Sequence, residues 1–278
     1  MSKLELYRSI ATDLSSGEIV FPTSVQVALK LRKALEDPEC HVELAAKLIA
    51  AEPMLATRVV AVANSVAYNR SGREITDVRT AVSRVGFSTL RSLVMGLLTR
   101  QLAAGSSEST KKLANQLWEH TAHVASLARA LAKHVTKVDP ETAMFAGIVH
   151  EIGGFYLLSC AEHKPELLEG DFSEWIEAGE IEVGRAVLQK LSVPATVTEA
   201  IEGFWDGYLA MPSVSLSDTL LLADELAPVP SPLRQINQPE VSGGLAAQID
   251  MLVGEELLST ILKESEEEIS TLISALHF

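Results

Sequence analysis

The chain has 278 residues, of which 47% are hydrophobic, and 37 acidic against 23 basic side chains give it a net charge of −14. These values exclude a largely disordered chain, and no apolar run approaches the roughly 18 residues that a membrane span needs. Because Cys40 and Cys160 form no metal-ribbon or disulfide pattern and no signal region opens the chain, we expect a reduced, cytoplasmic protein.

The first hundred residues predict a series of short amphipathic helices. Apolar residues recur there at three- and four-residue spacing, and prolines and glycines mark the ends of each stretch. Thr76 or Asp77 can cap one of these helices, which ends at Gly86. The expected elements are helices over residues 23–36, 44–49, 53–66, 77–86 and 88–102, with a turn at 69–72.

Residues 103–110, which include a Gly-Ser-Ser run, are the best candidate for a linker. We therefore divide the chain into an N-terminal helical subdomain, residues 1–105, and a C-terminal helical subdomain, residues 106–278. Each half alone would expose an apolar stripe, so the two are expected to pack against each other.

The C-terminal part also predicts helices. Asp139 and Pro140 form a cap-then-proline start, and the helix that follows is expected to run through Ile152 and to end at Gly153-Gly154. The other expected helices cover residues 111–135, 172–191, 194–204 and 215–226, with an amphipathic tail from 246. Residues 228–239, with four prolines, predict an irregular connection, and the acidic run 264–268 predicts a solvent-exposed face. No stretch alternates with period 2 long enough for a sheet, so the sequence predicts an all-α fold.

The charge is distributed unevenly along the chain. Residues 58–100 carry seven arginines and only two acidic side chains, whereas residues 101–278 carry 10 basic and 27 acidic ones. A chain of this net charge repels phosphate, so nucleic acid is not an expected partner. The plainest interpretation is that the arginines lie scattered on exposed helix faces. The alternatives left open are an anionic protein or nucleotide partner and a DNA reader of the helix-turn-helix type over Arg79–Arg91. A polar patch beside the arginines is the expected partner surface, made by Asn64, Tyr68, Arg70, Arg73 and Arg84.

Histidines are the main candidates for catalytic or metal-binding residues, because the common phosphate-loop, dinucleotide and serine-hydrolase motifs are absent from the sequence. His120 lies on the apolar stripe of the long helix predicted over residues 111–135, and His150 follows Ile148-Val149. The two helices could bring both rings together, and a histidine pair with carboxylates is a ligand set for a divalent metal that activates water. The plainer interpretation is that each is a hydrogen-bonded core histidine.

Several motifs resemble those of the HDOD family, signalling-output relatives of the HD superfamily of metal-dependent phosphohydrolases. The segment AMFAGIVHEIG at residues 143–153 is similar to the family's A-x-F-x-G-L-L-H-D-I-G line. Further similar segments are LWEHT at 117–121, AEPMLATRV at 51–59 with ANS at 63–65, ITDVRTAVSRVG at 75–86 and ADEL at 223–226. The resemblance covers about residues 20–275 and implies an HD-like helical bundle with an additional N-terminal helical subdomain packed against it.

The resemblance also implies site positions. His120, His150 and Asp224 fall on the superfamily's first histidine, doublet histidine and late aspartate, whereas Glu151 replaces the doublet aspartate. The positions of three further histidines are held by Glu180, Phe204 and Trp205. Phenylalanine cannot ligate a metal and indole offers only a donor, so a two-metal site loses several ligands. We expect the remnant positions His120, His150, Glu151 and Asp224 to hold no cofactor; a single divalent metal is the alternative.

The function expected from the resemblance is a non-catalytic, regulatory module of bacterial signal transduction that acts through protein–protein interaction. A metal-dependent phosphohydrolase with a reduced metal site, acting on a nucleotide or cyclic dinucleotide, is the first alternative. The DNA-binding regulator is the second.

Overall fold

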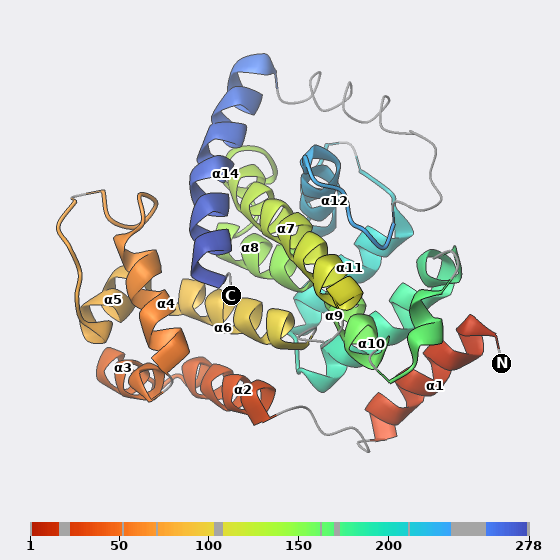
Figure 1. Ribbon diagram of the computed structural model, residues 1–278. Helices are drawn as coiled ribbons and strands as arrows, with labels where there is room; N and C mark the ends of the chain where they lie inside the picture. Colours follow the sequence, from red (N-terminus) through yellow and green to blue (C-terminus); the bar gives the residue numbers. More distant parts are fainter. Residues whose placement is uncertain are drawn as a thin grey trace.

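The computed structural model describes residues 2–16, 23–51, 53–70, 72–102, 108–161, 163–169, 173–210, 212–234 and 254–276 (Figure 1). These residues form helices and connections without a strand, so the all-α prediction is confirmed. The α-helices are α1 Lys3–Ser16, α2 Thr23–Glu36, α3 Val42–Ala50, α4 Pro53–Asn64, α5 Val78–Val85, α6 Phe87–Leu102, α7 Glu108–Leu131, α8 Pro140–Val149, α9 Ile152–Ala161, α10 Glu180–Lys190, α11 Ala195–Asp206, α12 Leu216–Leu226 and α14 Glu255–Leu276. Shorter helical turns cover Ala132–Thr136, Pro165–Leu168 and Trp175–Gly179.

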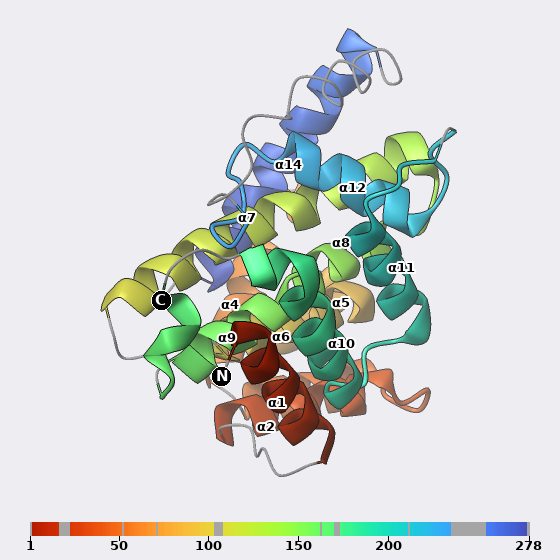
Figure 2. The same ribbon diagram turned by 90° about the vertical axis from the view of Figure 1, so that its right-hand side faces the viewer.

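The long helix α7 is the axis of the C-terminal part, and α8, α12 and α14 pack along it (Figure 1). Helix α10 packs on α9, and α11 packs on α8 and α12 (Figure 2). Helix α6 joins the two parts, because it packs against α2 as well as against α8 and α9. Helices α3, α4 and α5 pack together at one side of the molecule.

Capping residues begin and end several helices where the sequence predicts them. Asp77 caps α5 by accepting a 2.8 Å hydrogen bond from the Thr80 N–H, and Gly86 follows that helix with φ +81°. Asp139 caps α8, and Pro140 occupies its first turn. These predictions are confirmed because capping depends on local chemistry alone.

The predicted helix from Asp139 to Gly153-Gly154 is wrong at its end. Helix α8 ends at Val149, His150 and Glu151 form a turn, and α9 runs through both glycines. A Cβ atom on Gly153 would lie 2.7 Å from the Gly184 Cα, so glycine here permits close packing of α9 on α10. Tertiary packing thus decides a position at which local sequence predicts a stop.

One segment, Pro140–Ala161, is long and apolar enough to cross a membrane by length and composition, contrary to the prediction that no run approaches this length. It comprises α8 and α9, and 83% of its most apolar window is buried inside the protein. The segment therefore forms the core of the C-terminal part in this structure.

The prediction that residues 264–268 form a solvent-exposed face holds for the exposed Glu266 but is wrong for Glu268. Glu268 is buried and lies 2.6 Å from the Arg129 guanidinium, and Glu264 pairs with Lys133 and His134. The reason is that α14 packs against α7, which places Glu268 against Arg129 of that helix.

The subdomain boundary near residue 105 stays a prediction. Contacts cross it at both ends of the chain: α1 packs against α10, and α14 packs against α4 as well as α7.

Asp218 should contribute measurably to stability. Its carboxylate accepts hydrogen bonds from the N–H groups of Ala210, Val214 and Ser215 and from the Ser215 hydroxyl. Burial by itself raises the pKa of Asp218, but these hydrogen bonds lower it more, so its pKa lies below the ordinary value of an aspartate. We expect Asp218→Asn to reduce the free energy of unfolding by about 2 kcal/mol at neutral pH, measured by urea denaturation.

A group whose pKa is lowered on folding stabilises the protein above its unfolded pKa, and this contribution is lost as the pH falls through the folded value. The difference between wild type and Asp218→Asn should therefore shrink below about pH 4. The exposed Asp206→Asn serves as the control and should change stability by less than about 0.5 kcal/mol. Equal losses in the two variants would contradict this assignment.

Candidate functional site

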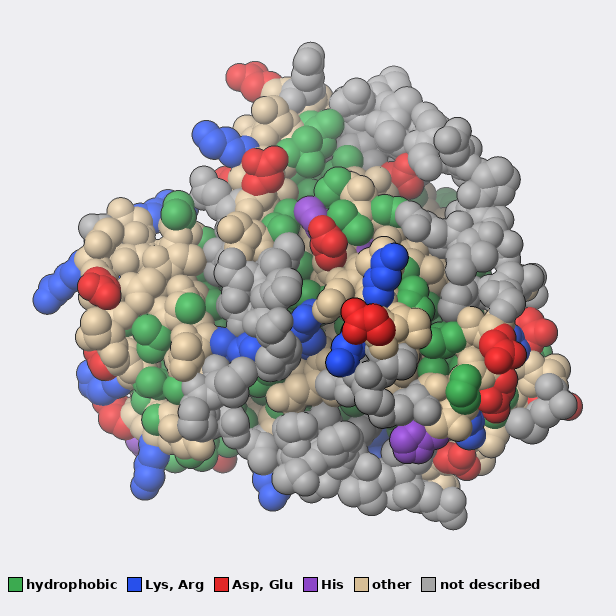
Figure 3. All heavy atoms as spheres, viewed as in Figure 1, with side chains coloured by type: hydrophobic (Ala, Val, Ile, Leu, Met, Phe, Trp, Pro, Cys, Tyr) green, Lys and Arg blue, Asp and Glu red, His purple; other side chains and the backbone are tan. Residues whose placement is uncertain are grey.

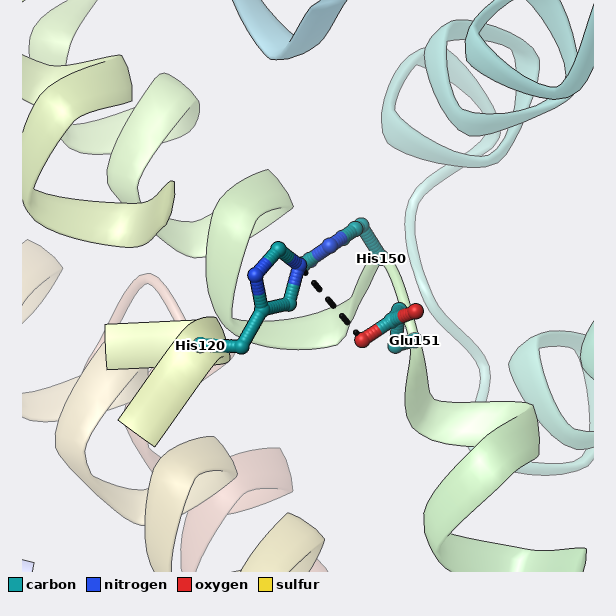
Figure 4. Close-up of side chains that lie close together, drawn as sticks. All are labelled: His120, His150 and Glu151. Carbon is teal, nitrogen blue, oxygen red and sulfur yellow. Dashed lines mark ion pairs between the residues drawn. The ribbon is translucent and has the colours of Figure 1, made fainter. Parts of the chain in front are cut away.

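His120, His150 and Glu151 meet in the interior of the C-terminal part (Figure 4). His120 reaches in from the middle of α7, and the other two come from the turn between α8 and α9. The side chains are 1–3% exposed, and one ligand-type atom from each lies within 4.8 Å of the others. The sequence prediction that two helices bring these histidines together is consistent with this geometry.

Backbone carbonyls orient both imidazole rings. The Val229 carbonyl lies 2.8 Å from Nδ1 of His120, and the Gly147 carbonyl lies 2.7 Å from Nδ1 of His150. A carbonyl only accepts, so each Nδ1 carries the proton and each Nε2 faces the centre of the cluster. The His150 Nε2 is buried without a hydrogen-bond partner in the described part of the chain, whereas the His120 Nε2 faces two carboxylates.

The late aspartate joins the cluster from α12. Asp224 Oδ1 lies 3.2 Å from Nε2 of His120, and Glu151 Oε2 lies 3.6 Å from the same nitrogen. Burial lowers the pKa of His120, but Glu151 and Asp224 raise it more, so the net pKa lies above its ordinary value. Burial, together with the charge of His120, lowers the pKa of His150 to about 3, so this imidazole stays neutral at neutral pH.

Arg234 covers the outer side of the carboxylates and was not predicted from the sequence. Its Nη2 lies 3.0 Å from Glu180 Oε1, its Nη1 lies 3.5 Å from Asp224 Oδ2 and its Nε lies 3.8 Å from Glu151 Oε1. Its guanidinium carbon stands 4.6 Å from the centre of the Phe204 ring, a cation–π distance. Burial disfavours the charge, but Glu180, Asp224 and Glu151 raise the pKa of Arg234.

Arg234 belongs to the connection after α12, where the sequence predicts irregular structure. Two further residues hold this connection in place. The Val229 carbonyl accepts a hydrogen bond from the His120 Nδ1, and Leu233 is buried against α9 near Gly154. The one available sequence signal is that Arg234 is the only arginine after position 185.

The residues present fit one divalent cation. Their donor set is two imidazole nitrogens and two carboxylates, and one ligand-type atom each from His120, His150 and Glu151 converges on the same point. Binding of both Nδ1 protons to carbonyls matches the usual support of metal-binding histidines. A second metal does not fit, because Glu180 is bound to Arg234 and Phe204 packs 5.5 Å from the His150 ring, centre to centre.

The five residues of the predicted partner surface differ in accessibility. The Asn64 amide bonds Val60 and both backbone groups of Ile75, so it holds the turn after α4. The Tyr68 hydroxyl contacts Thr89 and Glu268. Arg70, Arg73 and Arg84 are exposed. Figure 3 shows Lys and Arg side chains at the rim of the lobe that contains α3, α4 and α5.

The region of the DNA-binding alternative does not present a row of free arginines. Arg79 pairs with Glu43 at 2.7 Å, and the half-buried Arg91 bonds the Leu35 carbonyl. The geometry therefore does not favour this alternative.

The sequence pattern of the HDOD domain matches residues 21–205, so the chain belongs to the HDOD family. A curated relative, an uncharacterized protein of Treponema pallidum, is 24% identical over 187 residues, which make up 62% of this chain. The chain spans about a third of that relative's length, 35%.

Two solved structures share the fold. A candidate metal-dependent phosphohydrolase of Shewanella amazonensis is 24% identical, with a TM-score of 0.72 over 98% of this chain and 100% of that one. An HDOD domain protein of unknown function from Geobacter sulfurreducens is 20% identical, with a TM-score of 0.65 over 99% and 100%. The predicted HD-like helical fold is therefore confirmed.

Proposed function

We propose that this protein is a non-catalytic regulatory module of bacterial signal transduction, acting in the cytoplasm by binding a protein partner. The observation that supports it is Arg234, whose cationic group already neutralises the outer oxygens of the site. A catalytic metal site keeps a coordination position open to water and substrate. Here the outer oxygens of Glu151 and Asp224 face an arginine that also contacts Glu180 and Phe204, which supports a closed, non-catalytic site.

The loss of the second-metal positions supports the same proposal. Both carboxylate oxygens of Glu180 accept hydrogen bonds from Arg234, and the apolar ring of Phe204 packs against His150. These contacts are those of a packed scaffold. The membership in the HDOD family agrees with a signalling role.

A metal-dependent phosphohydrolase is the second candidate, favoured by the convergence of ligand-type atoms of His120, His150 and Glu151. His120, His150, Glu151 and Asp224 would hold one divalent ion, which when bound lowers the pKa of a bound water. Arg234 would hold the Glu151 and Asp224 carboxylates in position from their outer side. The substrate of this second candidate, a nucleotide or cyclic dinucleotide, is what the family resemblance implies.

Metal content and hydrolysis separate the two functions. The protein is purified without chelator or histidine tag and supplied with Mn, Fe, Zn, Ni and Mg. Elemental mass spectrometry then measures its metal content, and bis-p-nitrophenyl phosphate serves as the substrate that measures hydrolysis. The regulatory proposal expects near-zero metal and no hydrolysis. About one metal per chain that disappears in His120→Ala, together with hydrolysis that disappears in His150→Ala, would establish the enzyme instead.

Charge reversal tests the partner surface in cells that produce this protein. A partner that co-purifies with the wild type should be lost on Arg70→Glu with Arg73→Glu and retained in His150→Ala. The exposed pair Lys111→Glu with Lys112→Glu is the matched control for two reversed charges. Retention of the partner by the arginine variant, or its loss from the lysine control, would contradict the proposed surface.

A further inference from the structure

A cavity of about 390 Å³ lies where α2, α6, α8 and α11 meet. Its lining residues are distinct from the His120 cluster. Its volume falls within the usual range of small-molecule pockets, roughly 300–1,000 Å³. Because α2 and α6 belong to residues 1–105 and α8 and α11 to residues 106–278, the cavity is walled by both predicted subdomains.

One wall of the cavity is rich in hydrogen-bonding groups. Ser88, Ser92 and Arg91 line it from α6, and Thr142 and Thr196 from α8 and α11. Ser92 is 1% exposed, and its hydroxyl has no hydrogen-bond partner among the described residues. A buried hydroxyl without a partner is costly, so a ligand atom at this position would satisfy it.

Arg91 gives this wall a positive charge. Its guanidinium donates two long bonds of 3.3 Å, to the Leu35 carbonyl and to the Ser88 hydroxyl, which leaves donors to spare. Within the described ranges it has no ion pair. Helix α11 begins at the same cavity after Pro194, and no side chain caps its first N–H groups, so its positive dipole end is open.

The carboxylates in the lining already have partners. Glu36 lies 3.0 Å from the buried Arg32, and Glu141 receives 2.9 Å and shorter bonds from Arg129. Asp139 is the N-cap of α8. Asp139 bonds only the neutral N–H and hydroxyl of Thr142, and Arg91 forms no ion pair with any of these carboxylates among the described residues, so its guanidinium can take the anionic group of a ligand.

The remaining wall is apolar and consists of Phe145, Pro194 and Val197. We propose that the cavity binds a small organic anion, with its carboxylate or phosphate group toward Arg91 and the start of α11 and its apolar body against this wall. The proposal is independent of the regulatory function argued above and of the His120 cluster.

Ligand-observed saturation-transfer NMR on the full chain tests the proposal with phenyl phosphate, benzoate and the neutral benzamide as probes. We expect at least one anion to bind, and benzamide to bind about tenfold more weakly or not at all. Preference for phenyl phosphate or for benzoate tells which anionic group the site takes. Absence of binding by both anions at about 10 mM overturns the proposal, as does equal binding of benzamide.

Three variants locate the binding. Arg91→Gln should weaken binding of the preferred anion about tenfold, and Ser92→Ala should weaken it several-fold while keeping the charge. The exposed Arg73→Gln removes the same charge elsewhere and should bind like the wild type. Circular dichroism monitors folding, and Ser92→Ala carries the test by itself where Arg91→Gln unfolds. Unchanged binding in both cavity variants, or equal loss in Arg73→Gln, overturns the proposed site.

Discussion

Replacing Arg234 by methionine is expected to reduce the free energy of unfolding by about 3–5 kcal/mol. Methionine keeps the apolar contact with Phe204 but removes the cation, so the carboxylates of Glu151, Glu180 and Asp224 lose their shared partner. Glu151 and Glu180 are buried, and water cannot replace the lost charge there. Urea denaturation followed by circular dichroism measures the loss.

A second substitution distinguishes the loss of the positive charge from the loss of side-chain packing. Glu180→Gln in the Arg234→Met background removes one of the carboxylates left without a cation, so it should restore about 1–2 kcal/mol, although the same change in the wild type is destabilising. The control is Arg185→Met, which breaks an exposed pair with Glu202 and should cost less than about 1 kcal/mol. A loss in Arg234→Met no larger than in this control would contradict the counter-ion role of Arg234.

Gly147→Ala is expected to cost about 3 kcal/mol, although alanine is the better helix former by about 1 kcal/mol. An added Cβ would lie 2.5 Å from the Ala125 Cα and 2.9 Å from its nitrogen. These are backbone atoms of α7, so no side chain can rotate away and the two helices must separate. The separation would also move His150 relative to His120, because α8 ends at His150.

Gly203→Ala in α11 is a matched control for this prediction. There the added Cβ would meet the Ser217 hydroxyl at 2.6 Å and the Ser217 Cβ at 3.1 Å; the hydroxyl can rotate away, and the Cβ contact needs a shift of only a few tenths of an ångström. We expect its stability to stay within about 0.5 kcal/mol of the wild type in the same urea titration. Similar stability of the two glycine variants would show that the contact between α7 and α8 tolerates a methyl group.

The remnant site shows which site residues the sequence motifs predict and which they do not. His120, His150, Glu151 and Asp224 were named from a family resemblance, and the structure brings them together because α7, α8 and α12 pack on one another. Whether they hold a metal stays a prediction. The sequence does not predict the role of Arg234, because this residue stands in a proline-rich connection without periodicity. Its contacts form only where that connection folds back over Glu180.

The amino-acid sequence by itself determined the helical class, the capped helix starts at Asp77 and Asp139, and the family motifs, because each depends on neighbouring residues or short spacings. Tertiary structure decided that α9 continues through Gly153 and Gly154, that Glu268 is buried against Arg129, and that one arginine pairs with three carboxylates from different elements. These features depend on contacts between helices far apart in the chain. Such contacts leave no local pattern, because burial and charge pairing are settled only when whole elements meet.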